Sequence, residues 1–188
     1  MSGAPRLRFR LRMVLSSSPM VMATHAFSVS TKMAITREAF AEKGNREGQL
    51  DCSHGLTLDL RYHQPLLLVC DRENRRLCHF DPDGKYVGTV TQHLHRPCQV
   101  SFKGDYAVVS ELEGRVTVLD GDNVPIAFLG DNPQKPQWAN YDLDPRDIKA
   151  GAFSAAHGCF IDSDANIFVS DWNRTGRVTK LAKRKSES

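Results

Sequence analysis

An acidic residue followed four to six positions later by an arginine recurs three times in this chain, each time between two short apolar runs rich in branched residues. The acid ends one run and the arginine opens the next, which is the pattern of two strands joined by a tight hairpin. The acids are 40 and then 60 residues apart, and the longer step includes an insertion with three prolines at 131–152. The pairs are Asp71 with Arg76, Glu111 with Arg115, and Asp171 with Arg177.

Each hairpin lies inside a larger unit that turn residues divide into three or four short strands. Four-stranded units that repeat about every 40 residues are typical of propeller blades, and a single meander needs neighbours to bury both of its faces. We therefore predict an all-β fold, a partial β-propeller of about three four-stranded antiparallel blades, over residues 34–183. The predicted strands are 55–60, 66–70, 75–80 and 85–90, then 98–102, 106–110, 115–119 and 125–129, then 158–162, 166–170 and 177–181, with a further strand at 34–41.

The two ends of the chain differ in composition from the predicted blades. Residues 1–33 are rich in arginine and serine and contain no acidic residue, which is typical of a transit peptide. A secretory signal and an unstructured end are the alternatives, so a secreted or organelle-targeted protein is one expectation. Residues 184–188 are predicted to be a short C-terminal tail.

The charge of the predicted blades argues against nucleic acid as a partner. The first 37 residues contain six basic and no acidic residues, which leaves 19 basic and 22 acidic residues in the rest of the chain. A mildly acidic body does not provide the positive field that nucleic-acid binding needs. No apolar run approaches the roughly 20 residues of a membrane-spanning helix, so we expect no membrane span.

The five cysteines show neither the spacing of a metal site nor that of a disulfide framework. If Asp71 faces Arg76 across the hairpin, Cys70 faces Leu77, and Cys78 points to the opposite face of the sheet. We therefore expect Cys70 and Cys78 to be buried small apolar side chains and not a disulfide.

Several segments resemble the repeat of NHL-type propellers. The segments 44–50, 54–59 and 70–77 are together similar to one repeat unit, and 164–171 with 176–178 is similar to another. The resemblance implies a six-bladed ring of which this chain forms the last half, and a last blade of three strands, because the family closes its ring with an N-terminal strand. Such a half would expose two blade faces, so we expect two copies to pair as a homodimer that completes the ring, or the chain to be part of a longer product.

His54 and His157 occupy matching positions, each just before the predicted inner strand of a blade and each followed by glycine. Inner strands line the central channel, so both imidazoles are expected near the axis, while the blade between them has Pro97 and Cys98 at that place. Histidines in alternate blades suggest a three-fold site, and three neutral imidazoles with one open position are a zinc arrangement. The alternative is a pair of histidines that only line the channel or cap a strand.

Among NHL propellers, the zinc-dependent peptidylamidoglycolate lyases resemble the blade of His54 most closely, through the histidine that opens the blade and an Asp-Arg-Glu-Asn turn after its second strand. That resemblance implies zinc bound by His54 and His157, Arg72 holding the substrate carboxylate, and cleavage of a peptidyl-α-hydroxyglycine into a peptide amide and glyoxylate. The family's third histidine, second arginine and tyrosine are not matched, and Gly158 stands where the family can carry an aspartate. The alternative for Arg72 is a hairpin-tip arginine in surface ion pairs.

Two functions follow from these observations. The first is an interaction or scaffold module that receives a protein or peptide ligand at the channel face, because a fold alone does not assign chemistry. The second is a zinc lyase whose site is completed by a second chain or by further blades, so that the isolated half-propeller is expected to be inactive. Trp138 and Tyr141 in the insertion bear on both functions, because they could cover the channel mouth or pack on a blade edge.

Overall fold

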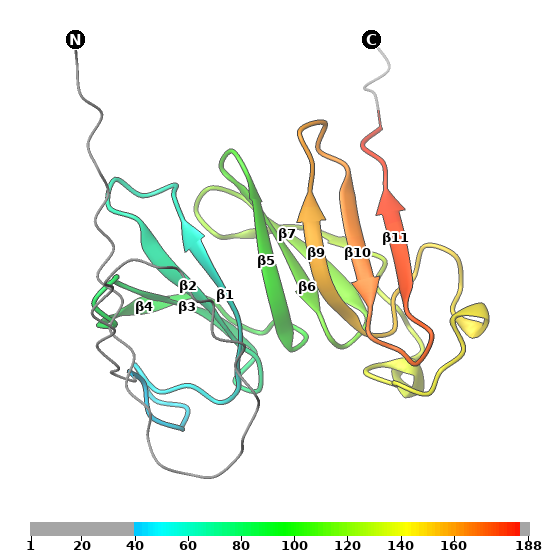
Figure 1. The fold of residues 1–188 in the computed structure, drawn as a ribbon, viewed down its shortest axis with the longest axis horizontal. Coiled ribbons are helices and arrows are strands. Elements are labelled where there is room, and N and C mark those ends of the chain that lie inside the picture. Colours follow the sequence, from blue (N-terminus) through cyan, green and yellow to red (C-terminus); the bar gives the residue numbers. More distant parts are fainter. Residues whose placement is uncertain (1–39, 185–188) are drawn as a thin grey trace, which may run out of the picture. The chain divides into compact units, whose positions relative to one another are not determined.

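The computed structural model describes residues 40–184, and its strands form three antiparallel sheets that follow one another along the chain (Figure 1). The segment 1–33, most of the strand predicted at 34–41 and nearly all of the predicted tail lie outside the described residues. Within the described part of the chain, no helix has the length and apolar character needed to cross a membrane.

Each sheet is a meander in which strands that follow one another along the chain are hydrogen-bonded neighbours. The insertion between the second and third sheets contains two short 3-10 turns, η1 (Lys135–Gln137) and η2 (Pro145–Asp147). The first sheet contains β1 (Ser53–Asp59), β2 (Leu66–Asp71), β3 (Arg76–Phe80) and β4 (Tyr86–Thr91); the second contains β5 (Pro97–Lys103), β6 (Tyr106–Glu111), β7 (Arg115–Leu119) and β8 (Pro125–Leu129); the third contains β9 (Ala156–Ile161), β10 (Ile167–Asp171) and β11 (Arg177–Leu181).

The first strands of the three sheets lie next to one another. Strand β5 contacts β1 and also β9, and Figure 1 shows β5 between these two strands. Successive meanders whose first strands are neighbours are the blades of a propeller. The protein is therefore a partial β-propeller with an all-β fold, as predicted, and the described part of its third blade has three strands.

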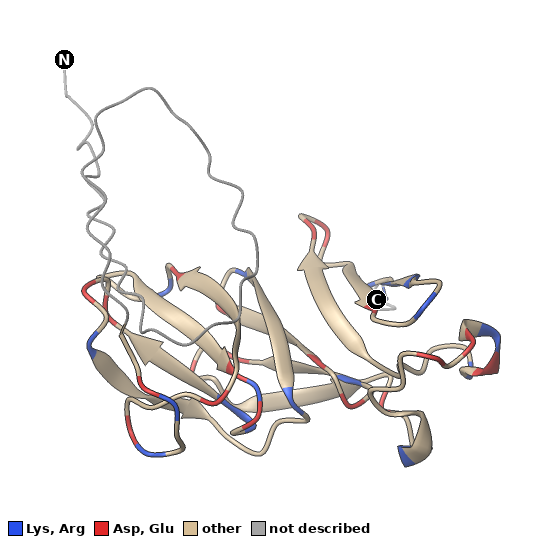
Figure 2. Cartoon of the chain, turned by 60° about the horizontal axis from the view of Figure 1, so that its bottom comes forward, with Lys and Arg blue, Asp and Glu red and all other residues tan. Residues whose placement is uncertain are grey.

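The blades pack face to face through apolar side chains that alternate along each strand. On β6, Ala107 and Val109 share a buried cluster with Leu68 of the first blade, whereas Val108 shares another with Val169 of the third. Neighbouring residues of a strand point to opposite faces, so one strand contributes to both interfaces. Charged residues gather at turns and strand ends, and the strand interiors are largely uncharged (Figure 2).

A buried acid–arginine ion pair closes the hairpin between the second and third strands of every blade. The three acidic side chains are at most 4% exposed. This arrangement confirms the register predicted from the sequence, in which the acid ends one strand and the arginine opens the next. The nitrogen–oxygen distances are 2.7 Å between Arg76 and Asp71, 2.8 Å between Arg115 and Glu111, and 2.6 Å between Arg177 and Asp171.

The same three carboxylates also hold the backbone that leads into each inner strand. Each carboxylate accepts hydrogen bonds from backbone N–H groups that lie one or two residues before the first residue of the inner strand. A carboxylate that binds both the arginine and this segment fixes where the inner strand begins. The N–H donors are Asp51 for Asp71, His95 for Glu111, and Ser154 and Ala155 for Asp171.

The first hairpin also confirms the prediction for the cysteines. Cys70 is opposite Leu77, and Cys70 and Cys78 lie in different buried clusters on the two faces of the sheet. All five cysteines are free thiols. Cys70 and Cys78 therefore act as small apolar side chains of the core.

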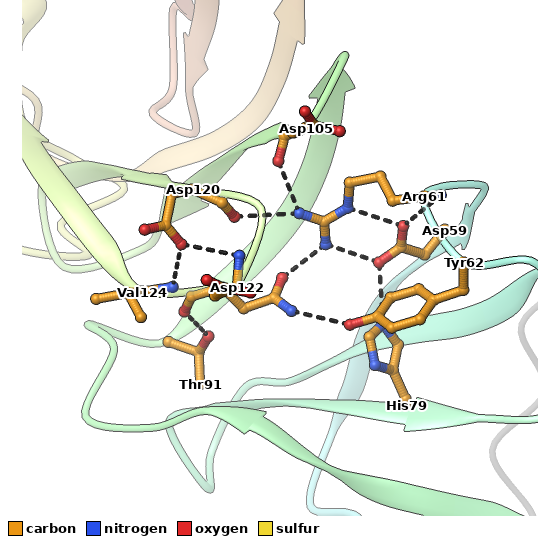
Figure 3. A network of polar contacts seen from close by, with 10 residues as sticks. Asp59, Arg61, Tyr62, His79, Thr91, Asp105, Asp120, Asp122 and Val124 are labelled. Atoms are coloured by element: carbon orange, nitrogen blue, oxygen red, sulfur yellow. Dashed lines mark hydrogen bonds and ion pairs between the residues drawn. The ribbon is translucent and has the colours of Figure 1, made fainter.

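A polar network that the sequence did not indicate joins the first two blades at the far end of β1 (Figure 3). Asp59 binds Arg61 at 2.7 Å and His79 at 3.0 Å, and Arg61 reaches the Asn123 side chain in the β7–β8 turn at 2.6 Å. Burial raises the pKa of Asp59, but the hydrogen bonds from Arg61 and His79 outweigh it and hold this pKa well below its usual value. The ionised carboxylate thus helps to set the spacing of the two blades.

Candidate metal centre

Two imidazoles meet at the ends of the inner strands of the first and third blades. His54 is the second residue of β1 and His157 is the second residue of β9, and their ring centroids are 4.5 Å apart in an edge-to-face arrangement. Both side chains are partly buried. Matching positions in the repeat therefore lead to one place in the structure. That these histidines bind zinc stays a prediction.

Cys98 brings a thiol to the same place. It is the second residue of β5, the inner strand between the other two, and it is 1% exposed. One ligand atom from each of His54, Cys98 and His157 lies within 4.8 Å of the other two. Cys98 was not predicted to be a ligand, although its place at the repeat position of the two histidines is a signal in the sequence that could have identified it.

The backbone of β5 orients His54. The Nδ1 atom of His54 lies 3.0 Å from the carbonyl oxygen of Cys98, and a carbonyl can only accept, so Nδ1 donates. In the neutral ring, Nε2 is then the unprotonated nitrogen that can bind a metal. Gly55 makes this approach possible, because a Cβ atom at that position would lie 2.2 Å from the same carbonyl oxygen.

His157 is held by the second blade and is kept neutral. The Ser110 hydroxyl donates to the His157 carbonyl oxygen at 2.9 Å, and this contact ties β9 to β6. Burial lowers the pKa of His157 from 6.5, and the nearby charges of His54 and Arg72 lower it further. Neutral imidazole is the form that binds metals, so His157 is prepared for that role at neutral pH.

Arg72, in the hairpin after β2, lies near two of the potential ligands, His157 and Cys98. Its positive charge opposes protonation of His157 and favours ionisation of Cys98, although burial dominates and raises the pKa of that thiol to about 12. Its Nε donates to Glu73 at 2.9 Å, and Arg96 binds the same oxygen of Glu73 at 2.6 Å. The ion pair expected for a hairpin-tip arginine is therefore present, and a role in holding a substrate carboxylate stays a prediction.

Two exposed aromatic rings extend the site beyond His157. The Trp172 ring lies 5.8 Å from the His157 ring, and Tyr141 from the insertion lies 5.0 Å from Trp172. Trp138 instead packs against His95 at 5.0 Å and donates to a carbonyl within the insertion. Of the two aromatic residues considered in the insertion, Trp138 packs on a blade edge, whereas Tyr141 lies beside the candidate site.

The donor set of the cluster suits zinc. Imidazole nitrogen and thiolate sulfur are typical zinc ligands, whereas magnesium and calcium prefer oxygen. In tetrahedral zinc sites, bonds of about 2.0–2.3 Å place the donor atoms roughly 3.3–3.6 Å apart. The cluster, with its atoms within 4.8 Å, would thus need to contract by about 1.5 Å at most.

No protein-family model matches the chain, and a search of curated proteins finds no match. Among solved structures, the chain is similar to a protein of unknown function from Bacteroides caccae, with a TM-score of 0.48 and 11% identity over 66% of this chain and 44% of that one. It is similar to a gluconolactonase from Xanthomonas campestris, with a TM-score of 0.44 and 14% identity over 63% and 36% of the two chains. It is also similar to virginiamycin B lyase from Staphylococcus aureus, with a TM-score of 0.42 and 10% identity over 70% and 41%. The chain thus spans about two fifths of the length of the structures it matches.

Proposed function

We propose that the protein is a zinc-binding half-propeller of the peptidylamidoglycolate lyase type, whose site acts on peptidyl-α-hydroxyglycines. The observation that carries this proposal is the meeting of His54 and His157 from different blades, with ring centroids 4.5 Å apart. Inner-strand residues at matching positions face a common axis, and metal ligands must in addition lie within a few Å of one another, as these two rings do. The charge of Arg72 close to the same place supplies a second element of such a site.

The residues of this chain have separate roles in the proposed site. His54 and His157 would hold zinc, which as a Lewis acid would polarise the hydroxyl oxygen of the substrate. Arg72 would bind the substrate carboxylate through charge-assisted hydrogen bonds. Glu73 would retain Arg96 as its ion-pair partner when Arg72 turns toward the substrate, because it binds both arginines.

The lyase reaction also needs proton transfers that these residues do not provide. A proton leaves the hydroxyl group and another reaches the amide nitrogen as the carbon–nitrogen bond breaks. The tyrosine of the family's site has no match in this sequence, so we propose that a second chain or further blades supply the base. An isolated half-propeller is then expected to bind zinc and release little glyoxylate.

Metal analysis of the purified chain tests the proposal. We expect about one equivalent of zinc, lost in His54→Ala and in His157→Ala and retained in His63→Ala, which changes an exposed histidine outside the cluster. Release of glyoxylate from a hydroxyglycine peptide, measured with and without excess zinc, tests the activity itself. Absence of zinc binding would refute the proposal, and glyoxylate release per chain that does not rise with protein concentration would refute the part of it in which a second copy supplies the base.

A second candidate function is that of an interaction module, and the third blade favours it. Its outward face exposes Phe160 and Val178, which are 59% and 75% exposed, and Phe168 lies across from Phe160 on the same face. In a closed ring this face would be covered by another blade. We propose that a second copy covers it, and light scattering over a range of concentrations should show a dimer. Val178→Lys should shift the protein toward monomer, whereas Val124→Lys on a turn of the second blade should not.

A further inference from the structure

We propose that Cys98 is a third protein ligand of this centre, so that the metal is held by two imidazoles and one thiolate from three consecutive blades. The inference rests on the proposed zinc binding by His54 and His157. It differs from the three-imidazole site that the family resemblance implies, because the sulfur comes from the blade between the two histidines.

The position of Cys98 in the fold supports this assignment. His54, Cys98 and His157 are each the second residue of an inner strand, and these strands are neighbours with β5 in the middle. The buried carboxylates fix the backbone just before each of these positions in the same way. The same carboxylate contact thus positions all three side chains, and their ligand atoms lie within 4.8 Å of one another.

Among the buried thiols of the described residues, Cys98 is set apart by its short distance to both imidazoles. The Cys159 thiol donates to two backbone carbonyls, of Gln99 and Val108, and Cys70 is enclosed in an apolar cluster between blades. Cys98 also packs in a buried cluster, with Leu112 and Ala155, and its sulfur contacts the Arg96 carbonyl oxygen at 3.6 Å. A weak sulfur contact of this length costs little to give up for a metal bond.

The backbone of Cys98 already acts on the same centre. Its carbonyl oxygen accepts the hydrogen bond from His54 Nδ1 at 3.0 Å, so the unprotonated Nε2 is left as the atom that binds the metal. A partner that binds the far nitrogen of a ligating histidine fixes the ring in the orientation that the metal requires. One residue would thus orient one ligand through its carbonyl group and supply another through its sulfur.

The proposed ligand set has chemical consequences. Metal binding replaces the thiol proton with a sulfur–metal bond, and the proton passes to solvent. Three protein ligands leave one position of a tetrahedral centre open, which is the arrangement of catalytic zinc. The metal would therefore be fully held by one chain, and a second chain would be needed for the proton transfers and not for metal binding.

X-ray absorption at the zinc edge tests the ligand set directly on the wild-type protein loaded with zinc. We expect a sulfur neighbour at about 2.3 Å beside nitrogen neighbours at about 2.0–2.1 Å. The cobalt-substituted protein should show a thiolate-to-metal charge-transfer band in the near ultraviolet. Both signals should disappear in Cys98→Ser and persist in Cys52→Ser, which changes the exposed thiol two residues before His54.

The contribution of Cys98 to metal binding can be measured as a change in zinc affinity. Loss of a group that only orients a ligand commonly lowers metal affinity by about 10- to 100-fold. Loss of a ligand itself in Cys98→Ser should therefore lower zinc affinity on the order of 100-fold or more. Circular dichroism of the metal-free variant checks that it folds. Zinc bound with nitrogen neighbours alone would overturn the assignment of Cys98 and leave the two-histidine proposal standing, whereas failure of the wild type to bind zinc would overturn both.

Discussion

The close approach of β1 and β5 at Gly55 gives a sharp test of how the centre is built. In Gly55→Ala, the new Cβ atom would lie 2.2 Å from the carbonyl oxygen of Cys98 and 3.1 Å from the Cα atom of Gln99. These are backbone atoms, so no side-chain rotation can relieve the clash. The two strands would have to separate by about 1 Å, which would weaken the hydrogen bond between His54 and Cys98.

The size of the effect follows from three contributions. Overpacking of this kind typically costs about 1–3 kcal/mol, and loss of the hydrogen bond adds about 1 kcal/mol. Replacing glycine in a strand recovers about 0.5–1 kcal/mol, because alanine loses less backbone freedom on folding. We therefore expect Gly55→Ala to lower the free energy of unfolding by about 1–3 kcal/mol, and to weaken zinc binding by about 10-fold because His54 moves away from Cys98.

Urea unfolding and zinc titration measure these two effects. A loss of about 2 kcal/mol should lower the urea midpoint by about 1 M. Gly88→Ala in β4 is the matched control, because a Cβ atom there would meet nothing within 4 Å, and its stability should be unchanged or slightly higher. A Gly55→Ala variant with wild-type midpoint and wild-type zinc affinity would refute the idea that this contact sets the geometry of the centre.

Three further predictions concern the frame around the site. Asp71→Ala should lower stability by about 2–4 kcal/mol in chemical unfolding, because it removes the buried carboxylate partner of Arg76 and the acceptor of the Asp51 N–H, whereas Arg146→Ala removes an exposed ion pair and should leave stability unchanged. Because the folded state lowers the pKa of Asp59, its contribution to stability is present at neutral pH and is lost as pH falls below 3.8; acid titrations of Asp59→Asn should show a smaller loss there than the wild type. Cobalt binding should quench tryptophan emission, and the quenching should be largely lost in Trp172→Phe and retained in Trp138→Phe, because only Trp172 stacks near His157.

The repeat units were predictable because their signals are local. Branched apolar runs and turn residues set the strands, and the pairing of Asp71 with Arg76 set the register of the hairpin. The meeting of His54 and His157 was expected from their equivalent positions, because equivalent residues of neighbouring blades face a common axis. These inferences needed only the spacing of residues within a repeat and the matching of positions between repeats.

The contacts between blades were less accessible from the sequence. Asp59 has a counterpart in Asp162, but its contact with His79 and the link through Arg61 to Asn123 depend on how two blades pack. Cys98 resembled the other buried cysteines in its neighbours along the chain, and only its distance from two imidazoles sets it apart. Such features arise from packing between units, which spacing within a unit does not encode.

The acid that braces each blade has a consequence for how propellers of this kind can change over time. Because Asp71, Glu111 and Asp171 each anchor the entrance to the inner strand of their own blade, the place where that strand begins is fixed within its own unit, and contacts from the next blade only refine the orientation of its side chains. Blades could then be lost, exchanged or supplied by another molecule while the remaining blades keep their side chains directed to the same point. Functional side chains held in this way belong to interchangeable blades, and a site can be assembled from different blades without a change in the backbone segments that hold them.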